Sequence, residues 1–303
     1  MYQQTLFEDD HLSKVINVAS IPQRSPFRYP GGKTWLVPQV RRWLCNRKRK
    51  PAELIEPFAG GGIIALTVAA ENLAKHVTMV ELDDEIAAVW QTILGKEAKW
   101  LAESILTYKL SREMLYEDLQ KKPKSRREKA FQTILKNRTF HGGILAPGSG
   151  FLKNGENGKG ISSRWYPQTL AKRILHIEAM RDRISFVQGD GIEVISKAAV
   201  RSDVVFFIDP PYTASGKKAG RRLYTHFDLD HERLFQVVSN ISGDFLMTYD
   251  DAEGVRELAK DHSFDTELVS MKNTHHAEMR ELLIGPDLSW ARGNVIVRAA
   301  GPS

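Results

Sequence analysis

The sequence predicts an α/β fold built on a parallel sheet, and three observations lead to this prediction. Short apolar stretches of strand length recur along the chain, with helical apolar spacing between them, as in strand–helix–strand units. The stretch at residues 204–208 is apolar at every position, which is typical of a strand buried on both faces. The first stretch leads through a glycine turn into a helix, as dinucleotide-binding folds begin. The expected strands are residues 53–58, 76–80, 184–188, 204–208 and 245–249, with others near 264–271, 279–285 and 294–298.

The composition is that of an ordinary soluble protein. The chain has 303 residues, 42% of them hydrophobic and 26% charged, and no apolar run approaches the roughly 18 residues of a membrane span. The first twenty residues lack the apolar core of a secretory signal, and we expect residues 1–23 to form a flexible leader. The single cysteine, Cys45, excludes an intramolecular disulfide and suits a reducing cytoplasm.

The first motif is PFRYPGGK, at residues 26–33, in front of an expected helix. Its GGKT string suggests a phosphate-binding loop, but the spacing excludes one, because Phe27 stands where the first glycine of that motif should be. Nucleoside triphosphate hydrolysis is therefore disfavoured.

The second motif is EPFAGGG, at residues 56–62, between an expected strand and the helix at 63–70. Glycines allow close approach of the backbone to a ligand, and the helix start offers free amide hydrogens. The motif is not G-x-G-x-x-G, and Glu56 is an awkward neighbour for a pyrophosphate but a good one for a cation. These residues favour a sulfonium cofactor over NAD.

The next expected strand delivers Glu81, which stands 21 residues after Gly60. A carboxylate at this distance can accept hydrogen bonds from a ribose diol. Asp83 and Asp84 are better explained as acidic caps of the helix that follows.

Residues 95–183 interrupt the α/β pattern and concentrate positive charge. They hold 19 Lys and Arg against 9 Asp and Glu, whereas the rest of the chain holds 24 against 28. Helical patterns at 97–106, 111–120 and 126–138 lead to a loop at 141–163 that contains seven of the 22 glycines, and a helix at 167–183 follows. We expect a DNA-contacting insert; a solvated helical face or a mobile lid are the alternatives. The candidate DNA contacts are Arg126, Arg127, Arg138, Lys153, Lys159 and Arg164, with Lys217 and Arg221 from the basic loop at 213–226.

The third motif is Asp209-Pro210-Pro211-Tyr212, which ends the apolar strand at 204–208. Two prolines require a stiff, extended turn, and the carboxyl ends of strands in open α/β sheets are where ligands bind. The turn offers a carboxylate, carbonyls and an aromatic ring, which suit a flat molecule with an exocyclic amino group. The simpler alternative is a strand closed by a proline turn with a solvated aspartate.

Taken together, PFRYPGGK, EPFAGGG, VEL, the basic insert, GD and DPPY resemble, in this order, the Dam-like family of DNA adenine-N6 methyltransferases. The resemblance covers roughly residues 24–300 and implies a seven-stranded Rossmann-like sheet, S-adenosylmethionine as methyl donor with S-adenosylhomocysteine as product, double-stranded DNA as partner, and base flipping. It further implies a catalytic domain of residues 24–94 and 184–303, with a mostly helical target-recognition domain at 95–183 inserted between its halves.

The resemblance also implies roles for individual residues. Tyr29 would stack on the cofactor adenine, Glu81 would hold the ribose, and Asp190 would bind the adenine amino group. The cofactor residues expected on this basis are Tyr29, Gly32, Lys33, Glu56, Phe58, Gly60, Gly62, Glu81, Asp190 and Asp209. The expected catalytic residues are Asp209, Pro210, Pro211, Tyr212 and Lys33, and no metal is expected.

Other functions stay open at this point. N4-cytosine methylation would need the same amine geometry, although such enzymes more often carry serine before the two prolines. Methylation of RNA or of a protein side chain is a further alternative, and the basic insert disfavours the protein case. The chain could also be a catalytically silent nucleic-acid-binding module. We expect a cytoplasmic, nucleoid-associated protein of prokaryotic or phage type, a monomer or weak dimer, with a cognate restriction endonuclease as a possible partner.

Overall fold

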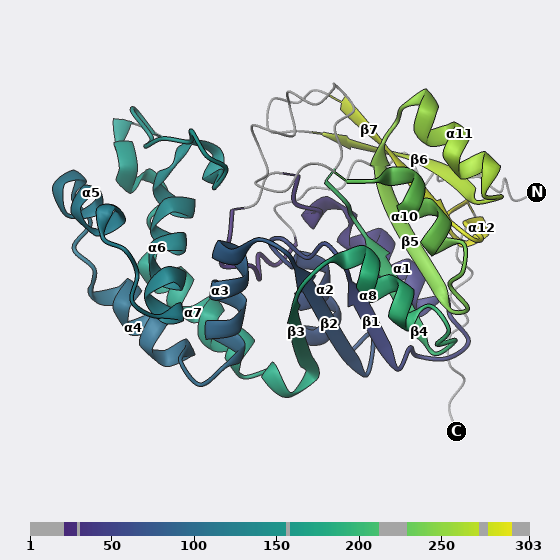
Figure 1. Cartoon of the computed structure of the whole chain (residues 1–303), viewed down its shortest axis with the longest axis horizontal. Helices are drawn as coiled ribbons and strands as arrows, with labels where there is room; N and C mark the ends of the chain where they lie inside the picture. Colours follow the sequence, from purple (N-terminus) through teal and green to yellow (C-terminus); the bar gives the residue numbers. More distant parts are fainter. Residues whose placement is uncertain (1–20, 29–30, 156–157, 212–228, 273–277, 293–303) are drawn as a thin grey trace, which may run out of the picture.

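A computed structural model describes residues 21–28, 31–155, 158–211, 229–272 and 278–292 of the chain. It contains a seven-stranded sheet with helices on both faces and a group of helices beside the sheet (Figure 1). The sheet order is β3-β2-β1-β4-β5-β7-β6. The strands are β1 (Glu53–Glu56), β2 (His76–Glu81), β3 (Ile184–Gln188), β4 (Val204–Ile208), β5 (Asp244–Asp250), β6 (Asp265–Lys272) and β7 (Glu278–Gly285).

The strand directions determine where a ligand can bind. β1 to β5 are parallel to one another, whereas β7 is antiparallel to both β5 and β6. The order reverses between β1 and β4, which is the topological switch point of a doubly wound sheet. The loops that follow β1, β2, β3 and β4 therefore meet at one edge of the sheet.

Two apolar layers sandwich the sheet because strand side chains alternate between its faces. In β4, Val205 and Phe207 belong to the core cluster that includes α1 and α2, whereas Phe206 and Ile208 pack with α8, α10 and α11. Phe206 and Phe207 are fully buried, and each contributes about 1.5–3 kcal/mol by burial. These helices are α1 (Val37–Cys45), α2 (Ile63–Ala70), α8 (Gly191–Ala198), α10 (His231–Val238) and α11 (Glu253–Asp261); α12 (Ser289–Arg292) contacts α1.

The helices between β2 and β3 form the group at the left of Figure 1. They are α3 (Asp84–Leu94), α4 (Ala98–Thr107), α5 (Arg112–Gln120), α6 (Arg126–Thr139) and α7 (Pro167–Glu178). Leu101, Ile134 and Ile174 from three of these helices belong to the same core cluster as Trp90 of α3. The segment at 95–183 therefore shares the core of the sheet, and a small separate cluster forms around Leu115, Leu135 and Ile161. Its role as an inserted domain stays a prediction.

The α/β prediction is confirmed, and the predicted strands coincide with β1 to β7 to within two residues at each end. The expected strand at 294–298 lies outside the described residues. The helix expected at 167–183 ends at Glu178, and a 3₁₀ turn, Arg181–Arg183, follows it. Of the expected leader, residues 1–20 lie outside the described part, while Ile21 is buried in the core. No described helix combines the length and hydrophobicity needed to cross a membrane.

Candidate active site

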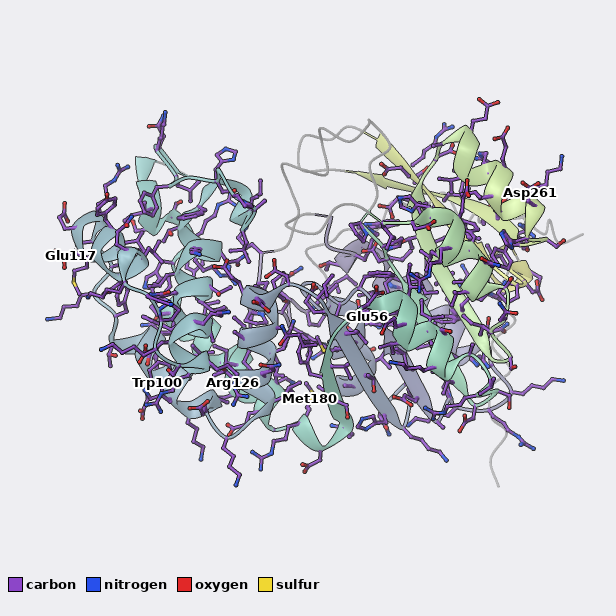
Figure 2. All side chains as sticks on the ribbon, viewed as in Figure 1. Glu56, Trp100, Glu117, Arg126, Met180 and Asp261 are labelled. Carbon is purple, nitrogen blue, oxygen red and sulfur yellow. The ribbon has the colours of Figure 1, made fainter. Side chains whose placement is uncertain are left out.

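A cavity of about 530 Å³ lies at the carboxyl edge of the parallel strands. Its lining includes residues from all three predicted motifs, among them Lys33, Glu56, Gly62 and Asp209. The turns after β1, β2, β3 and β4 form one side of the cavity, and α6, α7 and the segment before Lys33 form the other. Figure 2 shows Glu56 at the centre of the molecule, where the sheet meets the helical group.

Glu56 ends β1 and contacts the first turn of α2. Its Oε2 atom accepts a hydrogen bond from the Ala65 amide at 2.9 Å. This contact takes the place of a side-chain cap, because the N-cap residue of α2 is Gly62. Burial raises the pKa of Glu56 well above its usual range, and the charges of Asp209 and Glu81 add to the effect.

The glycine turn after β1 leaves no room for a side chain. Gly62 has a φ of 62°, and a Cβ there would lie 2.4 Å from Met79 Cε and 3.1 Å from the Trp90 ring. The Trp90 indole N–H donates to the Gly60 carbonyl at 3.0 Å. This hydrogen bond holds the turn against α3. Trp90 is fully buried against the turn and is not among the residues that line the cavity.

Glu81, at the end of the neighbouring strand β2, binds the backbone of the glycine turn. Its Oε2 accepts from the Gly60 amide, and its Oε1 accepts from the Leu82 and Asp83 amides, each at 2.9 Å. Burial raises the pKa of Glu81 to about 7, against the lowering effect of these hydrogen bonds. Each carboxylate oxygen has two lone pairs, so Glu81 keeps acceptor capacity for a ligand in the cavity.

Asp190 lies at the third strand end and caps α8. Its Oδ1 accepts from the Ile192 amide at 2.7 Å and from the Glu193 amide at 3.4 Å. The next residue, Gly191, touches the second motif, since a Cβ there would lie 2.4 Å from the Pro57 carbonyl oxygen. Phe58, Asp190 and Gly191 all line the cavity.

Asp209 follows β4, and both contacts of its carboxyl group are made by the same oxygen, Oδ1. Its Oδ1 lies 2.9 Å from Lys33 Nζ and accepts from the Thr248 hydroxyl at 3.0 Å. In the described part of the chain its Oδ2 has no hydrogen-bond partner, and the side chain is 21% exposed at the cavity. Lys33 is 3% exposed, donates to the Gly31 carbonyl at 3.0 Å and also lies 3.4 Å from Glu281 Oε1. Pro210, Pro211 and Gly32 line the same cavity.

Sequence reasoning missed Thr248 and Glu281. Thr248 is the polar residue in the apolar strand β5, and Glu281 is an acid directly before the apolar run Leu282-Leu283-Ile284 in β7. A charged or polar residue within a buried strand needs a partner, and this was the available signal.

The opposite wall of the cavity is basic. Arg138 and Arg173 donate to the Pro26 and Ser25 carbonyls, respectively. Burial lowers the pKa of Arg138 to about 10 and also lowers that of Arg173. Asn137 is buried next to them and binds both the amide and the carbonyl of Arg28, each at 2.8 Å. Arg138, predicted as a surface DNA contact, is therefore part of the cavity wall.

Of the other predicted DNA contacts, those that the structure describes do not line the cavity. Arg126 and Arg127 begin α6, where each pairs with Glu97, and Arg127 also lies over the Trp100 ring. Figure 2 places Arg126 and Trp100 along the lower edge of the helical group. Lys153 and Lys159 are exposed, and Arg164 is half-buried. Tyr29, Tyr212, Lys217 and Arg221 lie outside the described residues.

The residues present fit a cationic adenosyl cofactor. Five acidic side chains, those of Glu56, Glu81, Asp83, Asp190 and Asp209, line the cavity beside a glycine turn that allows close backbone approach. The volume is that of small-molecule sites in general. No group of His, Cys, Asp or Glu able to hold a metal ion occurs among the residues that the structure describes.

This doubly wound sheet, with acidic and glycine turns at its switch point, belongs to the Rossmann-like class, and its cavity fits an adenosyl cofactor. The family model described as D12 class N6 adenine-specific DNA methyltransferase matches residues 29–276. The chain belongs to this family, and it is an S-adenosylmethionine-dependent methyltransferase. This confirms the predicted resemblance and the predicted cofactor.

Solved structures show more distant similarity. A methyltransferase from Geobacter sulfurreducens is 11% identical with a TM-score of 0.38, covering 85% of this chain and 80% of that one. An rRNA methyltransferase from Streptomyces viridochromogenes is 12% identical with a TM-score of 0.37, covering 92% and 94%. A putative RNA methyltransferase from Pyrococcus horikoshii is 12% identical with a TM-score of 0.36, covering 91% and 93%. Similarity at this level says nothing about the substrate. No curated protein sequence matches the chain.

Proposed function

We propose that the protein transfers a methyl group from S-adenosylmethionine to the N6 amino group of adenine at a specific site in double-stranded DNA, after the base has been flipped out. The orientation of Asp209 carries the proposal. Lys33 and Thr248 both contact Oδ1, and Asp209 lines the cavity, so Oδ2 is proposed as the acceptor for the target amine. Family membership supports DNA as the substrate and adenine as the base.

The chain's own residues would supply positioning and charge. The bound cofactor supplies a methyl group that is already activated by its sulfonium. The exocyclic nitrogen of adenine is a poor nucleophile because its lone pair is conjugated with the ring. Asp209 Oδ2 and the Pro210 carbonyl would each accept one N–H and favour a pyramidal nitrogen. These acceptors gain strength as positive charge develops on the nitrogen, so they bind the transition state better than the ground state.

The remaining residues that line the cavity would bind the cofactor. Glu81 and Asp190 would hold the ribose and the adenine of the cofactor, and Glu56 with the glycine turn would frame its methionine part. Tyr29 and Tyr212 are proposed to stack on the cofactor and on the target base. Extruding that base costs a few kcal/mol, which the stacking would offset.

The target base can be identified directly. The protein is expressed in cells that lack DNA methyltransferases, and the nucleosides of their DNA are separated by mass spectrometry while methylated positions are mapped by sequencing. N6-methyladenine in one sequence context is the expected product. N4-methylcytosine would reject the adenine assignment, and unmodified DNA together with undetectable S-adenosylhomocysteine binding would favour a silent binding module.

Asp209→Ala is expected to reduce methyl transfer at least about a hundredfold, because it removes an acceptor of the developing charge. Incorporation of labelled methyl into DNA measures the rate, and calorimetry measures S-adenosylhomocysteine affinity, which should stay within a few-fold of the parent. Retention of most of the activity would refute the role of Asp209. Asp209→Asn, which keeps the shape, is the matched comparison.

The cellular context is proposed from family membership alone. Such an enzyme would work in the cytoplasm on chromosomal or phage DNA. A cognate endonuclease partner and a monomeric or weakly dimeric state stay predictions, which sedimentation and co-purification can address.

A further inference from the structure

A buried carboxylate from the antiparallel part of the sheet reaches the proposed catalytic turn. Glu281 lies on β7, and its side chain is 4% exposed. In the β5–β7 ladder it stands opposite Asp250, the last residue of β5. None of the three motifs contains it, and the mechanism proposed above does not use it.

Glu281 acts on the catalytic turn through Lys33. The Lys33 ammonium lies 2.9 Å from Asp209 Oδ1, 3.4 Å from Glu281 Oε1 and 3.0 Å from the Gly31 carbonyl oxygen. Both carboxyl groups attract the Lys33 ammonium, which lies between them. Lys33 is therefore held from two sides, by the turn after β4 and by β7.

The charge count shows what the second carboxylate changes. Lys33 and Asp209 alone would form a neutral pair, and the negative charge of Asp209 would be largely compensated. Glu281 places a second carboxyl group beside the same ammonium, so Lys33 compensates the charge of Asp209 less completely. In methyl transfer to an amine, positive charge grows on the nitrogen that Asp209 would contact, so a less compensated Asp209 stabilises the transition state better.

We infer that Glu281 is a positioning residue for methyl transfer, which holds Lys33 against Asp209 Oδ1 and shares its positive charge. Oδ2 of Asp209 then stays both oriented and negatively charged for the target amine. The inference rests on the proposed function of Asp209. The simpler alternative is that Glu281 only neutralises a buried lysine and so stabilises the fold.

The test is Glu281→Gln, which keeps the shape and the acceptor oxygen but removes the charge. We expect the single-turnover rate of labelled methyl transfer to fall about tenfold, while affinities for S-adenosylhomocysteine and DNA stay within about twofold. Glu257→Gln makes the same chemical change at an exposed position of α11 and should leave the rate unchanged. An unchanged rate for Glu281→Gln, or a decrease matched by equal decreases of both affinities, would overturn the inference.

A second variant covers the case in which Glu281→Gln folds poorly. Glu281→Asp keeps the charge and shortens the side chain by one methylene. If charge is what matters, its single-turnover rate should exceed that of Glu281→Gln; the reverse order would reject the inference. Thermal unfolding of each variant shows whether the protein compared is folded.

This test separates the inference from the proposed function. The rate is the amount of labelled methyl incorporated into DNA, whichever base receives it, and nucleoside analysis of the parent identifies that base independently. If the product were N4-methylcytosine, the adenine assignment would fail, while the ratio of variant to parent rates would still report on Glu281.

Discussion

At the scale of single residues, Glu81 combines two tasks. It accepts three backbone hydrogen bonds that hold the glycine turn and the start of the next loop. It also lines the cavity, where the ribose of the cofactor is proposed to bind. Burial raises the pKa of this carboxyl to about 7, so its charge changes within the range in which such enzymes are assayed.

This pKa predicts a pH-dependent affinity. A ribose diol donates hydrogen bonds, so the ionised form of Glu81 is the better acceptor, and protonation as pH falls through about 7 should weaken binding. Between about pH 8 and pH 6 the dissociation constant for S-adenosylhomocysteine should rise about tenfold if only the ionised form binds. Calorimetry at several pH values measures this. Glu81→Gln should bind more weakly, without this pH dependence; the same pH dependence in the variant would exclude Glu81 as its origin.

At the scale of elements, the carboxyl-terminal end of α6 holds the segment that precedes Lys33. Asn137 is buried, and its side-chain amide binds the Arg28 amide, the Arg28 carbonyl and the Gly143 carbonyl, each at 2.8 Å. Arg138 and Arg173 add bonds to the Pro26 and Ser25 carbonyls. The basic helical group is thus joined directly to the wall of the cavity.

Asn137→Ala should lower the free energy of unfolding by about 3 kcal/mol, because it leaves buried backbone groups of Arg28 and Gly143 without partners. Urea denaturation, with the slope checked for two-state behaviour, provides the measurement. Asn240→Ala removes an amide from an exposed position at the end of α10 and is the control, with an expected change below about 0.5 kcal/mol. Equal stabilities for the two variants would contradict the role given to Asn137.

At the scale of the whole molecule, the predicted DNA contacts within the described part of the chain include two groups at opposite ends of α6. Arg126 and Arg127 are at its start and pair with Glu97. The loop that carries Lys153 folds back on the other end, where the Leu152 amide donates to the Thr139 carbonyl at 2.8 Å. With a rise of about 1.5 Å per residue, the ends of this helix are about 20 Å apart. Only the second group lies at the end of α6 that carries the cavity.

The salt dependence of DNA binding can distinguish the two groups. Replacing Lys153 and Lys159 by Gln should weaken binding and reduce the slope of log K against log salt by about two, because each phosphate that a lysine neutralises adds about one unit to the slope. Arg126→Gln with Arg127→Gln removes the same charge at the other end and should change the slope less. Fluorescence anisotropy with a double-stranded oligonucleotide, between about 50 and 200 mM salt, gives both slopes. A larger change for the arginine pair would place the DNA at the start of α6.

The sequence by itself determined the α/β class, the positions of the strands and the three motifs at their ends. These features are local: a buried strand needs a short apolar run, and a tight turn against a ligand needs glycine or proline. Glu56, Glu81 and Asp209 could therefore be identified from their place in the chain, whereas Lys33 was identified only from the family resemblance. The cavity brings the four residues together.

Only the tertiary structure decided which partners hold these residues. Glu281 and Thr248 reach the site because β5 and the antiparallel β7 are neighbours in the sheet, and Asn137 does so because α6 packs beside the segment before Lys33. It also divided the basic residues of 95–183 between a cavity wall, an ion-paired helix start and an exposed loop. Strand pairing and helix packing join residues far apart in the chain, and no local pattern encodes such contacts.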